Sequence, residues 1–164
     1  MNGKTKSGTP ARGGKAQGRS LARLGAVQAL YQMDLAGTGI NEIFADFERN
    51  RLGRDDSGTE IGVPDIPFFR DLVSGVVREQ RVIDPDVDHH LATGWRLTRI
   101  DSTLRAILRA GVYELRWRPD VPVRVVLDEY VELAHAFFDG DETRVVNGIL
   151  DTIAREHRGK ELVS

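Results

Sequence analysis

The sequence predicts an all-α protein with about seven helices. Apolar residues recur three and four positions apart along most of its 164 residues, as they do on the buried face of an amphipathic helix. No segment shows the sustained alternation of apolar and polar residues that marks a half-buried strand. The composition, with 40% hydrophobic and 29% charged residues, is that of an ordinary globular domain. We therefore expect a bundle of helices joined by short connections.

The first well-marked helix is predicted to begin at Arg19. Ser20 is a candidate cap for its start, and Gly37 and Gly39 would end it. Residues 1–18 are rich in glycine and small polar residues and bury too little to repay the entropy of ordering, so they predict a disordered basic arm. The apolar positions of the predicted helix are Leu21, Leu24, Val27, Leu30, Tyr31 and Leu35.

The chain between residues 41 and 91 predicts three further helices. Asn41 opens a short helix. Residues 51–63 show no periodicity and predict a loop. Asp65 caps the start of the next helix, and Asp84-Pro85 is expected to begin a separate short one, because proline is favoured in the first turn of a helix.

The C-terminal part predicts the remaining three helices. A break rich in glycine and aspartate near residues 93–101 separates an N-terminal helical half from a C-terminal one within a single compact unit. Asp101 caps the next helix, and Pro119 and Pro122 end it and set up another. The final helix follows the acidic turn at residues 139–141.

The net charge of -2 hides an asymmetry along the chain. Residues 1–23 hold six of the 23 basic residues and none of the 25 acidic ones, which leaves 17 basic and 25 acidic groups and a net charge of -8 on the remainder. A basic arm on an acidic body is expected where one end meets a polyanion. A solubilising leader would show the same pattern, so charge alone leaves both interpretations open.

Missing residue types and segments exclude several classes of protein. The chain has no cysteine, which excludes disulfides, zinc–cysteine sites, iron–sulfur clusters and a thiol nucleophile. No apolar run approaches the roughly 18 residues needed to span a bilayer. No apolar stretch follows the N-terminal lysines as it would in a secretory signal. We therefore expect a cytoplasmic protein.

The sequence carries no signature of an enzyme. Its four histidines form no His-Glu-x-x-His pair, and the glycines of the arm follow no strand that would make them a phosphate loop. Glu129 and Glu132 have the spacing of a carboxylate pair on one helix face, but no Glu-x-x-His segment completes a two-metal site. We expect no catalysis, metal or cofactor. An enzyme that uses these two glutamates is the alternative hypothesis.

A row of basic residues near the start of the chain favours nucleic-acid binding. Its members lie 3, 4 and 4 residues apart and would share one face of a backward-extended first helix: Arg12, Lys15, Arg19 and Arg23. Gly13, Gly14 and Gly18 oppose that extension by about 1 kcal/mol each, a cost that binding to RNA could offset. Arginine suits the task because its planar fork grips a phosphate in two places. The alternative is an ordinary helix start with a loose tail.

Three weaker features remain. A second basic row is expected to form a solvated helix face, with Asp101 paired to its first member: Arg105, Arg109 and Arg116. Gly148, in the middle of the last helix, suggests that another element packs closely there. Phe137 and Phe138 lie beside an acidic turn, where aromatic rings stack on unpaired bases or, more often, close the end of a bundle.

Five segments follow one another in a characteristic order within residues 19–158. They are Arg23–Leu35, Phe68–Gly75, Leu104–Leu115, Val121–Ala134 and Val145–Asp151. Together they resemble the NusB family of transcription antitermination factors, the first two matching its first and third helices. On this interpretation residues 1–18 are a flexible basic arm, residues 19–158 a NusB-like helical RNA-binding domain, and residues 159–164 a C-terminal tail.

The resemblance implies a fold of two packed three-helix bundles without catalytic activity. It also implies binding to boxA, a short single-stranded element of ribosomal RNA leaders, together with a small-subunit ribosomal protein in the NusE role. The pair is expected to join an antitermination complex on RNA polymerase and so support ribosomal RNA transcription. The resemblance leaves open whether the protein is a monomer or a homodimer.

The resemblance further implies which residues meet RNA. The arginine-rich start of the family matches Arg19 and Arg23, and Tyr31 is the aromatic residue one helical stretch further on. Because residues 20–22 interrupt this basic run, Arg12 and Lys15 are expected to supply the missing charge. The later RNA-facing region matches Phe137, Asp141, Arg144 and Asn147. The competing hypothesis is a helical protein-interaction module without specific RNA binding, whose acidic body docks a basic partner.

Overall fold

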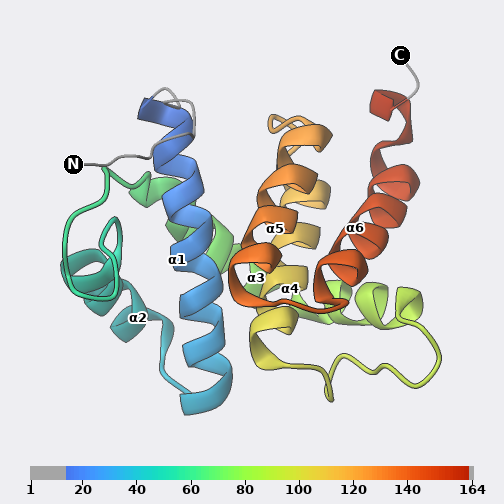
Figure 1. Cartoon of the computed structure of the whole chain (residues 1–164), viewed down its shortest axis with the longest axis horizontal. Helices are drawn as coiled ribbons and strands as arrows, with labels where there is room; N and C mark the ends of the chain where they lie inside the picture. Colours follow the sequence, from blue (N-terminus) through green and yellow to red (C-terminus); the bar gives the residue numbers. More distant parts are fainter. Residues whose placement is uncertain (1–13, 163–164) are drawn as a thin grey trace.

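The computed structural model describes residues 14–162, and this part of the chain is helical with no strand (Figure 1). An isolated bridge between Arg54 and Glu60 is the one β-type pairing in these residues. The all-α prediction is therefore confirmed. Residues 14–162 form six α-helices, α1 (Gly14–Ala36), α2 (Ile40–Asp46), α3 (Ile66–His90), α4 (Ser102–Trp117), α5 (Val123–Phe137) and α6 (Glu142–Arg158), with a π-helical turn, η1 (Phe47–Arg51), and a 3-10 turn, η2 (Gly159–Leu162).

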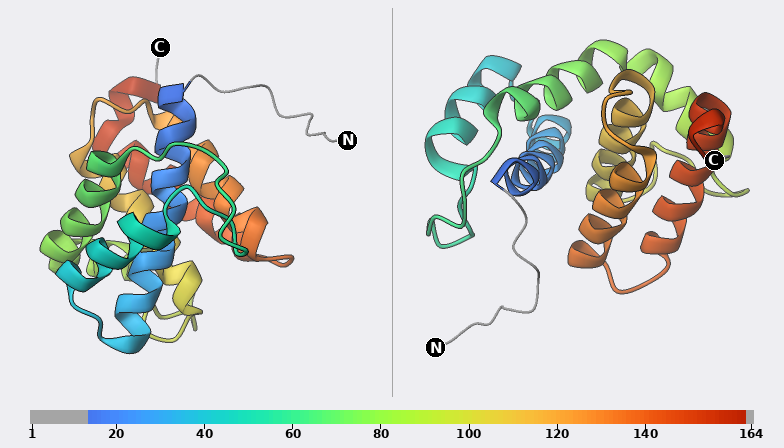
Figure 2. Two further views of the ribbon diagram at one scale, coloured as in Figure 1. Left: turned by 90° about the vertical axis from the view of Figure 1, so that its left-hand side faces the viewer. Right: turned by 90° about the horizontal axis from the view of Figure 1, so that it is seen from above.

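Helix α4 forms the centre of the fold. It packs against α1, α3, α5 and α6, and most of its residues from Leu104 to Leu115 are buried. Helices α1 and α2 lie to one side of it, α5 and α6 to the other, and α3 runs behind both groups (Figures 1 and 2). Two glycines allow the close approaches. A Cβ at Gly75 would lie 2.1 Å from the Tyr113 ring, and one at Gly111 would lie 2.7 Å from Leu150.

The helix count differs from the prediction because α3 is continuous. Asp84-Pro85 does not begin a separate helix, and Pro85 lies inside α3. Proline removes one backbone hydrogen bond, but tertiary contacts on either side hold the helix together. Ile83 and Val87 are completely buried. Arg109 of α4 donates two hydrogen bonds to the carboxylate of Asp84, at 2.9 and 2.8 Å.

Helix α1 begins before its predicted start. Residues 14–18 are helical, so the prediction of a disordered arm over 1–18 is wrong for them, and residues 1–13 lie outside the described part. Gly18 permits this extension because the loop passes close to it. Its carbonyl accepts a hydrogen bond from the Asp65 N–H at 3.0 Å, and a Cβ there would lie 3.0 Å from the Val63 oxygen. Ser20 is not a cap, since its hydroxyl lies mid-helix and donates to Glu129 at 2.6 Å.

The other helix boundaries follow local sequence signals. Asp65 caps α3 by accepting a hydrogen bond from the Phe68 N–H at 3.0 Å, and Asp101 caps α4 by accepting one from the Thr103 N–H at 2.7 Å. Gly37 follows the end of α1 with a φ of 67°, a conformation that favours glycine. The predicted tail is partly ordered, because Glu161 accepts a hydrogen bond from the Val123 N–H at 2.6 Å. No helix in residues 14–162 has the length and apolarity to cross a membrane.

Candidate nucleic-acid interface

Side chains of α1 and of residues 121–137, which include α5 (Figure 1), take part in lining two hollows. The first, which we call the arginine groove, has a volume of about 650 Å³ and is lined by residues that include Lys15, Arg19, Pro122, Val125 and Asp128. The second, the aromatic groove, has a volume of about 480 Å³ and is lined by Val27, Gln28, Tyr31, Gln32, Leu35, Ala36, Arg51, Thr103 and Phe137. Lys15 and Arg19 therefore lie in one hollow, and Tyr31 and Phe137 lie in the other.

Arg23 lies buried beneath this face and is 2% exposed. Its Nε and Nη2 donate to the two carboxylate oxygens of Glu114 at 2.7 and 2.9 Å, and its Nη1 donates to Glu129 at 3.0 Å. The Tyr130 hydroxyl also donates to Glu114, at 2.7 Å. Burial opposes the charge on Arg23, but the hydrogen bonds to Glu114 outweigh it and raise the arginine pKa above its ordinary value.

The structure corrects the predicted phosphate contact of Arg23. All three nitrogens of its guanidinium bond to internal carboxylates, so a phosphate would have to displace them. Glu129 is paired with Arg23 in the same network, so it does not form an open carboxylate pair with Glu132. The four-residue spacing correctly predicted that Arg19 and Arg23 share one face of α1. One turn after Arg19, however, that face is covered, and Arg23 pairs with Glu114 of α4 and Glu129 of α5.

Arg19 is held in place but only loosely paired. Its guanidinium lies 4.5 Å from the centre of the Phe68 ring and 3.6 Å from the Asp65 carboxylate, and its Nε is buried without a hydrogen-bond partner among residues 14–162. Asp120 lies 4.0 Å away but is already bound by Arg118, whose hydrogen bonds lower the Asp120 pKa to about 2. Arg19 is thus a positioned cation at the edge of the arginine groove. Lys15 is exposed nearby, and Arg12 lies outside the described residues.

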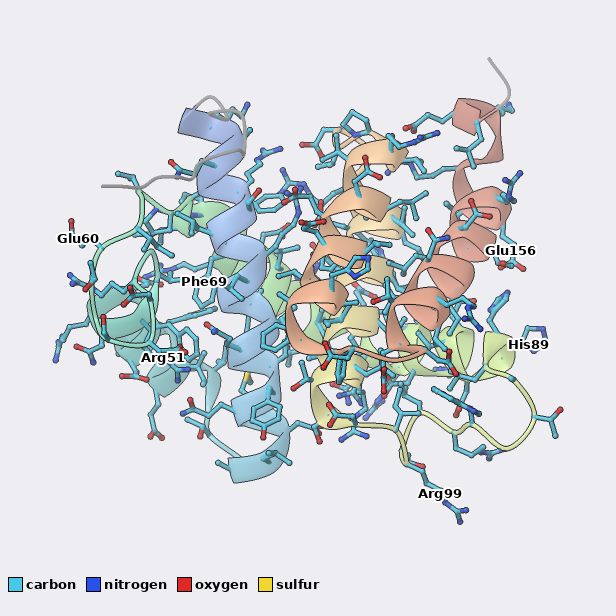
Figure 3. The ribbon with its side chains drawn as sticks, viewed as in Figure 1. Arg51, Glu60, Phe69, His89, Arg99 and Glu156 are labelled. Carbon is cyan, nitrogen blue, oxygen red and sulfur yellow. The ribbon has the colours of Figure 1, made fainter. Side chains whose placement is uncertain are left out.

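The aromatic groove joins two residues that are far apart in the sequence. Tyr31 comes from the end of α1 and Phe137 from the end of α5, and they are 39% and 41% exposed. Arg51 of η1 lines the same groove and lies between α2 and α1 (Figure 3). Sequence reasoning missed Arg51, because its position at the start of an aperiodic loop gave no signal that the loop would turn back on α1.

The other predicted RNA-facing residues lie in a separate place. Asp141, Arg144 and Asn147 are exposed at the start of α6. Asp141 and Arg144 line a hollow of about 320 Å³, the α6 hollow, together with Trp95, which is 37% exposed and which the sequence analysis did not single out. Asn147 is exposed but is not among its lining residues.

No described element packs closely against Gly148, contrary to the prediction from its position in the last helix. A Cβ at this position would meet no atom within 4 Å, so the expectation is wrong, and Gly111 of α4 is the glycine that α6 packs against. The local pattern could not distinguish the two, because both glycines lie inside helices and only the neighbouring helix decides which one is covered.

The second basic row holds helices together. Arg105 binds Asp34 of α1, Arg109 binds Asp84 of α3, and Arg116 binds Asp86 of α3. The expected pairing of Arg105 with Asp101 does not form, because Asp101 caps α4. The row therefore joins α4 to its neighbours and is not a freely solvated face.

The ends of α3 and α6 meet at a cluster of histidines and carboxylates (Figure 3). The His90 ring bonds the Asp86 carbonyl at 2.7 Å through Nδ1 and the Glu156 carboxylate at 2.9 Å through Nε2. Asp86, His90 and Glu156 can each offer a ligand atom within 4.8 Å of the others, a spacing that could hold a metal ion. Burial of the ring opposes its protonation, but these hydrogen bonds outweigh it and raise the His90 pKa. The contacts make the cluster an ion-pair clamp between the two helices.

Comparison with known proteins gives one consistent family. The model of the NusB family matches residues 20–155. A transcription antitermination protein NusB from Rhodopseudomonas palustris is 56% identical over 153 residues, which cover 93% of this chain and 88% of the relative. The NusB protein of Bradyrhizobium diazoefficiens is 56% identical over 147 residues, which cover 90% of this chain and 89% of the relative.

Solved structures agree with the sequence relatives. NusB of T. maritima superimposes with a TM-score of 0.71 at 27% identity, covering 88% of this chain and 96% of that one. A crystal structure of the antitermination factors NusB and NusE in complex with double-stranded RNA contains a chain that superimposes with a TM-score of 0.69 at 28% identity. It covers 85% of this chain and 98% of that one.

Proposed function

The chain belongs to the NusB family of transcription antitermination factors, and on that premise we propose that it binds boxA-type single-stranded RNA of ribosomal RNA leaders. It does so together with a small-subunit ribosomal protein in the NusE role. The pair acts within an antitermination complex on RNA polymerase in the cytoplasm, and the protein contributes binding without catalysis.

The observation that carries this proposal is the face between α1 and α5. It presents Lys15 and Arg19 at one hollow and Tyr31 and Phe137 at the next. Single-stranded RNA is bound by this combination, in which cations follow the backbone and aromatic faces receive unstacked bases. Among the described residues, no carboxylate lines the aromatic groove to repel a polyanion. An RNA strand running along this face would meet both hollows.

Lys15 and Arg19 hold the phosphates in this proposal, with Arg12 assisting from outside the described residues. Arg19 is suited to the role because Phe68 and Asp65 orient its guanidinium without satisfying its donors. A phosphate could supply the charge-assisted hydrogen bonds that the protein does not. Arg23 takes a different part, since its buried pairing with Glu114 and Glu129 positions α1 against α4 and α5.

Asp141, Arg144 and Asn147 orient the RNA or the protein bound beside it. All three are exposed at the start of α6, where Asp141 and Arg144 line the α6 hollow and Trp95 offers an apolar contact. The net charge of -8 outside residues 1–23 suits a basic ribosomal protein. A relative of known structure is a NusB and NusE complex with RNA, which supports a partner of the same kind here.

The test is binding of a short boxA-like RNA compared with a scrambled strand of the same length, with and without the ribosomal partner. We expect preference for the boxA-like strand and a tighter complex when the partner is present. Equal binding to both strands would leave only a general basic surface. If the partner binds but neither RNA strand does, the result would instead favour a protein-interaction module.

A further inference from the structure

Three of the four histidines of the chain gather where the end of α3 meets α6 (Figure 3). His90 and His157 both lie against the carboxylate of Asp86, with ring nitrogens 3.8 and 3.5 Å from its two oxygens. The His89 ring packs edge-on against the His90 ring, with 5.2 Å between their centres. Glu156 of α6 completes the group. Imidazole and carboxylate groups together form a donor set for divalent transition metals, and histidine is the commonest metal ligand in proteins.

The backbone of α3 determines which nitrogen of His90 is free to bind a cation. Nδ1 lies 2.7 Å from the Asp86 carbonyl oxygen, which can only accept a hydrogen bond. Nδ1 therefore carries a proton, and the lone pair of the neutral ring is on Nε2. A metal-binding histidine commonly has this arrangement, in which the nitrogen that does not bind the metal donates to a backbone carbonyl.

The free nitrogen of His90 faces a second acceptor. Nε2 lies 2.9 Å from the Glu156 carboxylate, which when ionised also only accepts hydrogen bonds. Two acceptors in contact need a positive charge between them. In the metal-free protein a second proton on the ring supplies this charge and gives the ion-pair clamp. A metal ion bound to both atoms would supply it without that proton.

The ligand atoms are spaced for a tetrahedral ion. Asp86, His90 and Glu156 can each offer one within 4.8 Å of the others. Zinc binds nitrogen and oxygen at about 2.0–2.2 Å, so two ligands of a tetrahedral ion lie roughly 3.4 Å apart. The contact between Nε2 and Glu156 therefore has to open by only about half an ångström, and the Glu156 side chain is 46% exposed and free to move. His157, with its Nε2 3.5 Å from Asp86, is placed to supply the fourth ligand.

The charge and position of Asp86 also suit a cation. Asp86 and His90 are four positions apart in α3, so their side chains project from the same helix face. Arg116 of α4 donates to Asp86 Oδ2 at 3.3 Å, and Oδ1 remains the oxygen that faces His90. With neutral histidines, one arginine and two carboxylates give the cluster a net charge of -1, which favours a cation. Sequence reasoning missed this site, because Glu156 lies 66 residues beyond His90.

We propose that Asp86, His90 and Glu156, with His157 as the fourth ligand, form a zinc site that ties the end of α3 to α6. Four protein ligands leave no open coordination position, so the site is structural and not catalytic. It holds the turn of α3 that follows Pro85, where the proline removes a backbone hydrogen bond. This inference does not depend on the proposed RNA-binding function.

The test is a calorimetric titration of Zn²⁺ into the full-length protein, freed of metal by a chelator and carrying no histidine tag. We expect one ion to bind per chain. The thermal midpoint should rise with added Zn²⁺, because a ligand that binds only the folded state stabilises it. Mg²⁺ at the same concentration should have no effect, since it prefers an octahedral shell of oxygen ligands.

Variants of the ligands locate the ion. His90→Gln and Glu156→Gln should each weaken Zn²⁺ binding by about tenfold or more, at least the loss typical of a residue that only supports a ligand. Two matched controls make the same changes at exposed positions of α5, His135→Gln and Glu132→Gln, and should leave the affinity unchanged. Circular dichroism verifies that each variant is folded. Glu156 is exposed, so Glu156→Gln still tests the site if His90→Gln unfolds.

Each outcome decides the question. Loss of Zn²⁺ binding in the ligand variants and its retention in both controls would support the site, whatever the result with RNA. Absence of Zn²⁺ binding to the unmodified protein would overturn the proposal. Binding that His90→Gln and Glu156→Gln leave unchanged, or that His135→Gln weakens equally, would place the ion elsewhere and overturn it as well.

Discussion

Arg23 and Glu114 form a two-point ion pair in the interior, with both carboxylate oxygens of Glu114 accepting from the guanidinium at 2.7 and 2.9 Å. Glu114 is completely buried on α4, and Arg23 joins it from α1. The pair explains why a basic residue in a predicted RNA-binding row contributes to the fold. Two further hydrogen bonds complete the network: the Tyr130 hydroxyl donates to Glu114, and Arg23 donates to Glu129.

Replacing Arg23 should destabilise the protein strongly. Arg23→Ala leaves the Glu114 carboxylate buried without its partner, and removal of one member of a buried pair costs about 3–5 kcal/mol. We expect this loss in the free energy of unfolding measured with urea. Arg19→Ala, one turn away at the surface, should cost about 1 kcal/mol or less. Equal losses for the two variants would contradict the assignment of Arg23 to the core.

Replacing Arg19 should weaken RNA binding without unfolding the protein. With Arg12, Lys15 and Arg19 as contacts, the logarithm of affinity should fall with the logarithm of salt at a slope of about -2. Arg19→Ala removes one phosphate contact and should make the slope shallower by about 0.7. Arg155→Ala on α6, where Arg155 pairs with Asp151, is the matched control and should leave the slope unchanged.

Deleting residues 1–13 should separate the RNA-binding and protein-interaction hypotheses. The deletion removes Lys4, Lys6 and Arg12 but leaves α1 intact from Gly14. We expect weaker binding to RNA in titrations and an unchanged thermal midpoint. Unaltered RNA affinity would show that residues 1–13, which include Arg12, take no part in binding and would favour the protein-interaction module.

Two glycine substitutions should act in opposite directions. Gly75→Ala would place a methyl group 2.1 Å from the Tyr113 ring, and such overpacking costs about 1–3 kcal/mol. Gly148→Ala meets open space inside α6, and we expect it to stabilise the protein by about 1 kcal/mol through helix propensity. Urea unfolding of both variants measures the difference. Destabilisation by Gly148→Ala would mean that α6 is not continuous through this position.

The His90 clamp should make stability depend on pH. Its pKa is raised in the folded protein above the ordinary value of about 6.5, so its contribution is complete below that value. The contribution is lost as the pH rises through the folded pKa. We expect the thermal midpoint of the unmodified protein to fall relative to that of His90→Gln as the pH rises above about 6.5. His135→Gln, an exposed histidine on α5, should leave this pH dependence intact.

Local signals in the sequence were sufficient for most of the fold. Helical periodicity predicted the all-α class, and Asp65 and Asp101 were recognised as caps because a capping bond joins residues two or three positions apart. Pro85 was misinterpreted as a helix start, because the buried neighbours that keep α3 continuous come from elsewhere in the chain. Sequence patterns therefore predict a helix boundary correctly when the contact that fixes the boundary joins residues close together in the chain.

The sequence by itself determined the all-α class, the charge asymmetry and the family to which this protein belongs. Only the tertiary structure decided that Arg23 turns inward while Arg19 stays at the surface, and that Tyr31, Phe137 and Arg51 share a groove. The physical reason is that spacing places residues on a helix face, whereas burial depends on which helices cover that face. Partners such as Glu114 lie 91 residues away from Arg23, beyond the reach of any local pattern.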